Sequence, residues 1–329
     1  MSSRRIVVVG SANQDYLVRV PRAPEGGETT IARSLVKLPG GKGANQAIAA
    51  ARLGGDVHFV GAVGRDDDGA RILRSLQKDG VTIDDVRIVD QAPTGLALIS
   101  VDDSGENAIT VVSGANDTVT AERASAAAIR LGGADTLVVL QGELPLDVLE
   151  ETARTCLAAG SRLILNLAPY REVAADVLAA ADPLVLNEIE ASQLLGEPVA
   201  GVDAALEAVG RLLTVSRSAV ITLGAQGAVW AGSRDGEEAA HVPARETSDV
   251  VDTTGAGDAF VGALAFALAS SADSAEPGQE SGSASLGDAV TLGTRAGTFA
   301  IRGVGAQSSY ARPADLGLGG GTGGAPSNP

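Results

Sequence analysis

A run of small residues between two aspartates, Asp252-Thr-Thr-Gly-Ala-Gly-Asp258, has the composition best suited to chemistry. It directly precedes residues 259–269, an apolar run with the composition of a buried helix. Glycines before a helix let the backbone approach a ligand closely and point free N–H groups at it, which is how proteins bind phosphate without basic side chains. The carboxylate of Asp258 would gain from the helix dipole and, facing a ligand hydroxyl, could accept its proton. Taken alone, the segment fits equally well a helix start that Asp258 merely caps.

A second glycine-rich segment, Gly40-Gly-Lys-Gly-Ala-Asn-Gln46, also stands before a helical stretch. It lacks the Gly-Lys-Ser/Thr ending and the preceding spacing of a Walker P-loop, so it is not that nucleotide loop. Gly255–Gly257 does not complete a Gly-x-Gly-x-x-Gly fingerprint, because position 260 is Phe, and a dinucleotide-binding interpretation is therefore weak. A tight turn without a ligand is the alternative for residues 40–43.

The overall charge restricts the partners. The chain has 329 residues and a formal net charge of −16, so its surface field repels nucleic-acid phosphates and anionic lipid headgroups. We therefore expect no nucleic-acid or membrane partner. An anionic ligand would have to be bound by local positive potential from backbone N–H groups, helix N-termini or a metal ion.

Cysteine and histidine usage excludes further classes of site. Cys156 is the only cysteine, which excludes an intrachain disulfide and a cysteine-rich zinc site, and we expect it to be a buried apolar residue. His58 and His241 have no partners at metal-ligand spacing, and we expect both to be structural or exposed. The start of the chain has only a four-residue apolar run, too short for a signal peptide or a membrane span, which predicts a cytoplasmic protein.

Alternating strand-like and helix-like stretches must position these segments. Short apolar runs predict buried strands at residues 6–9, 57–60, 137–140, 163–167, 183–186 and 219–223. Between them, stretches rich in alanine and leucine have helical spacing at residues 44–53, 69–78, 146–159 and 204–213. This alternation predicts an α/β domain with a mostly parallel central sheet.

Residues 94–112 break the alternation. Two apolar or alternating runs, 94–101 and 108–112, are joined by a polar connection that contains glycine, and they predict an antiparallel hairpin. Together with residues 16–20 and 29–38, the hairpin could form a small separate sheet, which we interpret as a lid. The alternative is an ordinary hairpin on the edge of the main sheet.

We expect one domain over residues 1–315, with lid strands from about 16–38 and 94–112. Residues 270–285 are rich in Ser, Ala, Glu and Gly, and residues 316–329 are mostly Gly with Pro and Ser. Such compositions are typical of unstructured segments. The second segment is therefore predicted to be a disordered tail.

Several motifs agree in order and spacing with the PfkB family of carbohydrate kinases, which the chain resembles over about residues 6–310. Asp252–Asp258 and Asn187-Glu-Ile-Glu190 mark the whole superfamily, whereas Gly40–Gln46 points to its ribokinase branch. The resemblance implies a ribokinase-like three-layer α/β/α domain with a mostly parallel central sheet and a small β-sheet lid. It also implies an ATP-dependent phosphotransferase that acts on the 5-hydroxyl of D-ribose, with deoxyribose, another sugar or a nucleoside as the alternative acceptor.

By the same resemblance, Asp258 is the catalytic base. The implied sugar-binding residues are Asn13, Asp15, Gly41, Lys42, Asn45, Glu143 and Asp258. The implied ATP-binding residues are Asn187, Thr222, Leu223, Gly224, Ala225, Gln226, Gly227, Gly257 and Asp258, with Gly255, Ala256 and Gly257 as an anion hole. Amide and carboxylate groups in the first set suit a polyol, because together they donate to and accept from paired hydroxyls.

The resemblance further implies two metal ions, Mg²⁺ with ATP and K⁺ as an activator. Asn187 and Glu190 form the motif associated with Mg²⁺ and phosphate. The implied K⁺ ligands, mainly backbone carbonyls, belong to Asp252, Thr254, Ala300, Gly303, Gly305 and Ser309. For residues 300–309, the late segment, the alternative is a glycine-rich turn without an ion. Leu167 and Leu186 stand where the family often has proline.

The predicted hairpin also bears on assembly. An apolar face on residues 94–112 would be exposed if the hairpin projected alone, and a lone small sheet is marginal in water. We therefore expect a homodimer in which lid packs against lid. A non-catalytic sugar-binding protein of the same fold is the rival from another class, and the intact Asp258 and Asn187–Glu190 argue against it.

Overall fold

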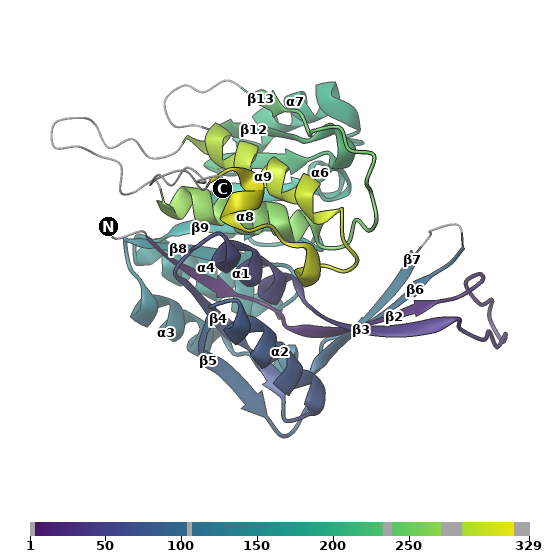
Figure 1. The fold of residues 1–329 in the computed structure, drawn as a ribbon. Coiled ribbons are helices and arrows are strands. Elements are labelled where there is room, and N and C mark those ends of the chain that lie inside the picture. Colours follow the sequence, from purple (N-terminus) through teal and green to yellow (C-terminus); the bar gives the residue numbers. More distant parts are fainter. Residues whose placement is uncertain (1–3, 104–106, 233–238, 271–284, 319–329) are drawn as a thin grey trace, which may run out of the picture.

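In the computed structural model of the protein, the described residues are 4–103, 107–232, 239–270 and 285–318. They contain a nine-stranded central sheet (Figure 1). Its parallel strands are β1 (Arg5–Val9), β4 (Val57–Gly64), β5 (Thr82–Val89), β8 (Thr136–Gln141), β9 (Arg162–Asn166), β10 (Ala181–Asn187) and β11 (Ser218–Thr222). At one edge, β12 (Ala228–Gly232) and β13 (Ala240–Val242) continue the sheet antiparallel. The strand order is β13-β12-β11-β10-β9-β8-β1-β4-β5.

Helices cover both faces of this sheet. One face packs against α1 (Lys42–Arg52), α2 (Asp67–Lys78), α8 (Ala256–Ser270) and α9 (Leu286–Ala300). The other packs against α3 (Ala121–Leu131), α4 (Leu146–Ala158), α5 (Ala175–Ala180), α6 (Glu188–Leu195) and α7 (Gly201–Leu212). Along β1, Ile6 and Val8 join the first core whereas Val7 and Val9 join the second, because successive side chains of a strand point to opposite faces. The predicted three-layer α/β/α arrangement is confirmed.

A smaller sheet projects from this body (Figure 1). It consists of β3 (Ser34–Gly40), β2 (Asn13–Arg19), β6 (Gly95–Val101) and β7 (Asn107–Val112), in the order β3-β2-β6-β7. Strands β6 and β7 form the expected antiparallel hairpin, paired from Leu96 with Val112 to Val101 with Asn107. The separate sheet is therefore confirmed, and the alternative of a hairpin on the edge of the main sheet is wrong. Strand β3 begins five residues after the predicted start at Thr29, since β3 starts at Ser34.

Some expectations concern residues outside the described ones. Of the segment 270–285, only Ser270, which ends α8, and Ser285, which caps α9, are described. Of the predicted tail 316–329, only residues 316–318 are described, and Leu316 ends a 3₁₀ turn that starts at Pro313. In the described ranges, no helix combines the length and the apolar character needed to cross a bilayer.

Candidate active site

The carboxyl ends of the parallel strands carry a row of polar side chains. Strands β8, β9, β10 and β11 end in Gln141, Asn166, Asn187 and Thr222, respectively. In an open α/β sheet, ligands bind outside these strand ends, near the position where the strand order reverses. Here that position is β1, which has β4 on one side and β8 on the other.

Asp258 lies in the first turn of α8, at the centre of this edge, and is only 7% exposed. Its Oδ2 accepts a hydrogen bond from Asn45 Nδ2 at 2.9 Å, and its Oδ1 accepts one from Gln46 Nε2 at 3.0 Å. Both donors belong to α1, so the glycine-rich segment before α1 and the one before α8 meet at one carboxylate. A role as a helix cap would not explain these two contacts.

Gln46 is itself fixed by the strand ends. Its Nε2 also donates to Asn166 Oδ1 at 2.9 Å, and its Oε1 accepts from Gln141 Nε2 at 2.9 Å. Gln46 is 1% exposed, so its amide has no freedom to exchange these partners with water. Gln46 ends the glycine-rich motif but was not predicted as a site residue, and neither were Gln141 and Asn166; their contacts link segments about a hundred residues apart.

Two further carboxylates lie in the field of Asp258. Burial, followed by the charges of Glu143 and Asp258, raises the pKa of Asp15 from 3.8 to about 7. Glu143 Oε2 accepts hydrogen bonds from Ser11 Oγ and, at 3.1 Å, from the backbone N–H of Lys42. The predicted sugar-binding carboxylates therefore gather at one place, together with Ser11, which sequence reasoning missed.

Lys42 supplies positive charge to this group of carboxylates. Burial by itself would lower the pKa of the Lys42 amine, but the charges of Asp258, Glu143 and Glu190 outweigh it and raise the pKa. The neighbouring Gly41 has φ 89°, and a Cβ there would lie 2.7 Å from the backbone nitrogen of Asn13. Only glycine fits this turn, which brings the start of α1 against β2.

The side chain of Asn13 is held by Asn116. It is 3% exposed, and its Oδ1 accepts a hydrogen bond from Asn116 Nδ2 at 2.8 Å. Asn116 Oδ1 in turn accepts from the backbone N–H of Ala12 at 3.0 Å. Asn116, in the 3₁₀ turn Gly114–Thr118, thus fixes the start of the small sheet against the main body. No motif in the sequence marked it.

A cleft of about 870 Å³ extends from the start of α8 towards α9, and its volume is typical of a small-molecule site. Of the predicted ATP-binding residues, Thr222, Gly224, Ala225, Gly227 and Gly257 line it. Leu223, Gln226, Asn187 and Asp258 are not among the lining residues, and Leu223 is buried at 3% exposure. Ala256 of the predicted anion hole also lines the cleft, and the remaining wall, which sequence reasoning missed, includes residues 244–248, Phe260, Thr294, Gly297, Thr298 and Ile301.

The Asn187–Glu190 motif forms the start of α6. Asn187 Oδ1 accepts from the backbone N–H of Glu190 at 2.8 Å, and Glu190 Oε2 accepts from that of Asn187 at 2.9 Å. This reciprocal capping box fixes both side chains at the strand edge. Burial raises the pKa of Glu190, which lies in the field of Lys42 and Asp258. Among the described side chains, no group of three or more His, Cys, Asp or Glu residues is arranged to hold a metal ion.

Asp252 joins the loop before α8 to the segment after α9. Its Oδ1 accepts from the backbone N–H of Thr254 at 2.9 Å, and its Oδ2 accepts from that of Gly305 at 2.8 Å. Burial alone would raise the pKa of Asp252, but the hydrogen bonds from Thr254 and Gly305 outweigh it and lower the pKa. Ser309 Oγ donates to the carbonyl of Gly305 at 2.8 Å. Four of the six predicted K⁺ ligands, Asp252, Thr254, Gly305 and Ser309, are therefore neighbours.

The turn at Gly255 packs tightly against the same late segment. Gly255 has φ 77°, and a Cβ there would lie 2.5 Å from the Cβ of Ala306 and 2.7 Å from the hydroxyl oxygen of Tyr310. The positive φ and the lack of space both require glycine. The late segment thus fixes the backbone whose N–H groups begin α8.

Comparison with known proteins places this geometry in context. The chain matches the pfkB family carbohydrate kinase over residues 3–313. It is 38% identical to a ribokinase of Bacillus subtilis over 271 residues, which is 82% of this chain and 87% of the relative. A ribokinase structure from Giardia lamblia superposes with a TM-score of 0.84 and 28% identity, covering 96% of this chain and 98% of that one. The Arabidopsis thaliana ribokinase complexed with ribose and ATP superposes with a TM-score of 0.82 and 30% identity, with the same coverage.

Proposed function

The chain belongs to the pfkB family of carbohydrate kinases, and we propose that it is a ribokinase, which transfers the γ-phosphoryl group of ATP to the 5-hydroxyl of D-ribose. The observation that carries this proposal is the position of Asp258. This buried carboxylate is held by Asn45 and Gln46 at the helix start that borders the 870 Å³ cleft. Its proximity to Asp15 and its position next to Gly257, which lines the cleft, support the assignment of Asp258 as the catalytic base.

In the proposed mechanism, Asp258 accepts the proton of the attacking 5-hydroxyl, a role typically worth about 10²–10⁴ in rate. The backbone N–H groups of Gly255, Ala256 and Gly257 at the start of α8 form the anion hole for the γ-phosphoryl oxygens. Phosphoryl transfer requires mainly in-line positioning and neutralisation of charge. The tight packing of Gly255 against Ala306 and Tyr310 supports a preorganised anion hole.

The proposed sugar site consists of Asn13, Asp15, Asn45 and Glu143, with Gly41 and Lys42 at the start of α1. The mutual proximity of Asp15, Glu143 and Asp258 supports it, since their charges together affect the pKa of Asp15. A carboxyl whose pKa is about 7 can donate to one hydroxyl and accept from another. An analogue lacking a hydroxyl would leave such a buried group unpaired, which favours a polyol of matching shape.

The proposed nucleotide site is the cleft lined by Thr222, Gly224, Ala225, Gly227 and Gly257. Leu223, Gln226 and Asn187 lie outside its wall, so their proposed part is to shape the strand ends beside it. Mg²⁺ would be held largely by the phosphates of ATP, because the nearby Glu190 offers one carboxylate, and Mg²⁺ commonly keeps waters and few protein ligands. When bound, it would neutralise charge between the β- and γ-phosphates.

The proposed K⁺ site lies where Asp252 and Thr254 meet residues 300–309, among them Ala300, Gly303, Gly305 and Ser309. The chemistry of the donors fits, since small residues in turns expose backbone carbonyls, and Asp252 binds the two segments together. K⁺ bound there would hold the loop that precedes the anion hole. A cytoplasmic location stays a prediction from the sequence.

The small sheet is proposed to act as a lid and to form the dimer interface. Strand pairing places Asp15, Leu17, Val36, Ile99, Ile109 and Val111 on one face of it. Val36, Ile109 and Val111 are 41%, 57% and 51% exposed. A second copy of the chain would cover this apolar face. The same face carries Asp15, which is proposed to bind the sugar. Sedimentation showing only a monomer at micromolar concentration would contradict this assembly.

A coupled assay for ADP formation tests the proposed function directly. The panel contains D-ribose, 2-deoxyribose, hexoses and nucleosides, each with MgATP in potassium buffer. We expect kcat/KM to be highest for D-ribose. A higher kcat/KM for deoxyribose or a nucleoside would support the proposed phosphoryl transfer but change the proposed acceptor. If no compound of the panel supports ADP formation, the proposed kinase activity is wrong.

A further inference from the structure

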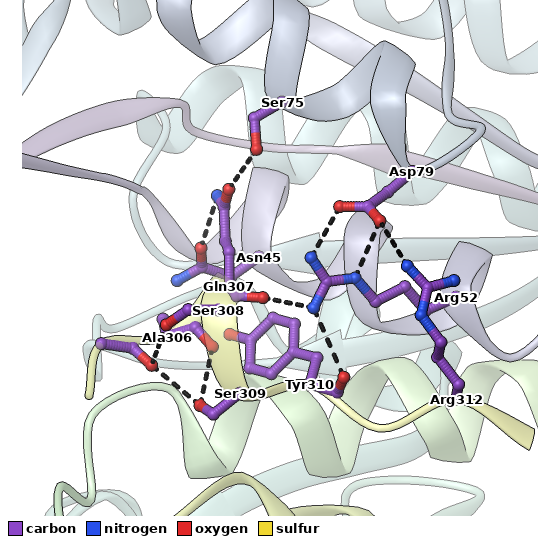
Figure 2. Close-up of polar contacts among 11 residues, drawn as sticks. Asn45, Arg52, Ser75, Asp79, Ala306, Gln307, Ser308, Ser309, Tyr310 and Arg312 are labelled. Atoms are coloured by element: carbon purple, nitrogen blue, oxygen red, sulfur yellow. Dashed lines mark hydrogen bonds and ion pairs between the residues drawn. The ribbon is translucent and has the colours of Figure 1, made fainter. Parts of the chain in front are cut away.

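Gln307 was not among the predicted site residues, yet its side chain contacts Asn45, a proposed sugar-binding residue (Figure 2). It lies in the 3₁₀ turn Gln307–Ser309 and is 5% exposed. Its Nε2 donates to Asn45 Oδ1 at 3.0 Å, and its Oε1 accepts from Ser75 Oγ at 2.7 Å. Asn45 Nδ2 then donates to Asp258 Oδ2 at 2.9 Å. A chain of hydrogen bonds thus runs from α2 to the proposed catalytic base.

The direction of this chain follows from the chemistry of its members. An ionised carboxylate only accepts hydrogen bonds, so Asn45 must turn its NH₂ group to Asp258 and its carbonyl oxygen away. That oxygen needs a donor, because Asn45 is 5% exposed and a buried unpaired carbonyl is unfavourable. The NH₂ group of Gln307 is this donor. With Gln307 in place, the reverse orientation of Asn45 would bring two NH₂ groups together.

The backbone of Gln307 is held rigidly by Arg52 (Figure 2). Arg52 Nη1 donates to the carbonyl oxygens of Gln307 and Tyr310, the latter at 3.3 Å. The same guanidinium makes two hydrogen bonds to Asp79, at 2.9 and 2.7 Å, and the Asp79 side chain is 3% exposed. A buried, bidentate pair of this kind fixes geometry well. Gln307 is therefore presented to Asn45 from a fixed main chain.

We propose that Gln307 is a positioning residue for phosphoryl transfer, which acts by holding the Asn45 amide with its NH₂ group towards Asp258. Asp258 is thereby kept aimed at the sugar hydroxyl before the sugar binds. The inference rests on the proposed function, in which Asp258 is the catalytic base. It assigns the late segment a role in the chemistry that is separate from the proposed K⁺ site.

Two substitutions break the two hydrogen bonds of Gln307 one at a time. Gln307→Glu keeps an acceptor for Ser75 and removes the donor to Asn45, whereas Ser75→Ala does the reverse. We expect kcat to fall at least about tenfold in Gln307→Glu, towards the ~10²-fold loss that a misplacement of about 1 Å can cause. The KM for ATP should stay within about twofold, because Gln307 does not line the nucleotide cleft. Ser75→Ala should lower the melting temperature and leave kcat near that of the unmodified protein.

A double-mutant cycle identifies the route of the effect. Gln307→Met, close in shape and unable to donate, should lower kcat in the unmodified protein but add little in an Asn45→Ala background, because the contact it removes is already absent. Additive losses, equal losses in Gln307→Glu and Ser75→Ala, or an undiminished kcat in Gln307→Met would each overturn the proposal. If Gln307→Glu does not fold, the cycle with Gln307→Met gives the same decision.

Asp258→Asn, measured alongside, separates this inference from the function on which it rests. Near-normal kcat in Asp258→Asn would remove the catalytic assignment itself. An inactive Asp258→Asn together with undiminished Gln307 variants would leave the proposed function intact and refute only the positioning role.

Discussion

Replacing Asp258 with asparagine changes two things at once in this structure. The basic oxygen needed to accept the hydroxyl proton is lost, while the size of the side chain is kept. In addition, the new NH₂ group must face either Asn45 Nδ2 or Gln46 Nε2, which both donate to Asp258. Neither amide can turn to accept from it, because Asn45 is held by Gln307 and Gln46 by the strand ends.

The expected magnitudes follow from these contacts. Two buried donors facing each other leave one hydrogen bond unmade, which costs about 1–3 kcal/mol of folding free energy. At about 2 °C per kcal/mol for a chain of this size, the melting temperature should fall by about 2–6 °C. The rate effect is larger, since loss of the base should lower kcat by about 10² or more. The nucleotide dissociation constant should change little, because the cleft wall is retained.

The assay measures kcat, both dissociation constants and the melting temperature on one preparation. Asp249→Asn is the matched control, because Asp249 is exposed and its substitution removes the same charge in the loop that precedes α8. A kcat within about tenfold of the unmodified protein would show that Asp258 is not the base. A lost kcat with an unchanged melting temperature would keep the base but refute the hydrogen-bond arrangement described around it.

Three further changes test the neighbouring sites. Glu143→Gln should raise the KM for ribose and leave the KM for ATP unchanged, because the Glu143 carboxylate accepts hydrogen bonds from Ser11 and Lys42 in the proposed sugar site. Steady-state kinetics with the opposite pattern would show that Glu143 does not bind the sugar. Asp15 has a pKa of 3.8 ordinarily and about 7 here, so the folded state retains a proton that the unfolded state loses, and stability falls as pH rises across this range. Asp15→Asn should remove that fall, so the melting temperature of the variant minus that of the unmodified protein should increase from pH 5 to about 8. A difference that stays constant over this range would contradict the raised pKa of Asp15. Activity should be much higher in K⁺ than in Na⁺, because a carbonyl-lined site favours the more easily dehydrated ion, and equal rates in K⁺ and a bulky organic cation at constant Mg²⁺ would show that the site is idle.

The parts of the fold that could be predicted from the sequence are those with strong local patterns. Strand β8 is buried along its whole length, so a continuous apolar run marked it. Strand β5 was missed because it lies at the sheet edge, half-exposed, with Asp84 and Asp85 in its middle. Helix α9 was missed because its apolar positions alternate with Gly and Thr, which are weak helix formers.

The candidate site divides in the same way. Asp258 could be found because its glycines and its helix are adjacent in the sequence. Gln307 and Asn116 could not, because each contacts the site residue it holds, Asn45 or Asn13, across 262 or 103 positions of sequence, and a single amide side chain leaves no periodic or spacing signal. The wall of the proposed nucleotide cleft on α9 was hidden for a similar reason, since Gly297 and Thr298 contribute space rather than charge.

The amides also explain how an acidic protein can gather carboxylates beside a proposed site for ATP. Burial, followed by the charges of Glu143 and Asp258, raises the pKa of Asp15, and Lys42 contributes a positive charge beside these carboxylates. Additional lysines would bind the phosphates but would also pair with Asp258 and weaken it as a base. Neutral donors such as Asn45 and Gln46 orient the carboxylate without contributing a net charge. We therefore expect Gln46→Lys to lower kcat, because a cation paired with Asp258 weakens it as a base, and to lower the melting temperature, because Lys cannot accept the hydrogen bond from Gln141. An undiminished kcat in Gln46→Lys would show that this amide is merely structural.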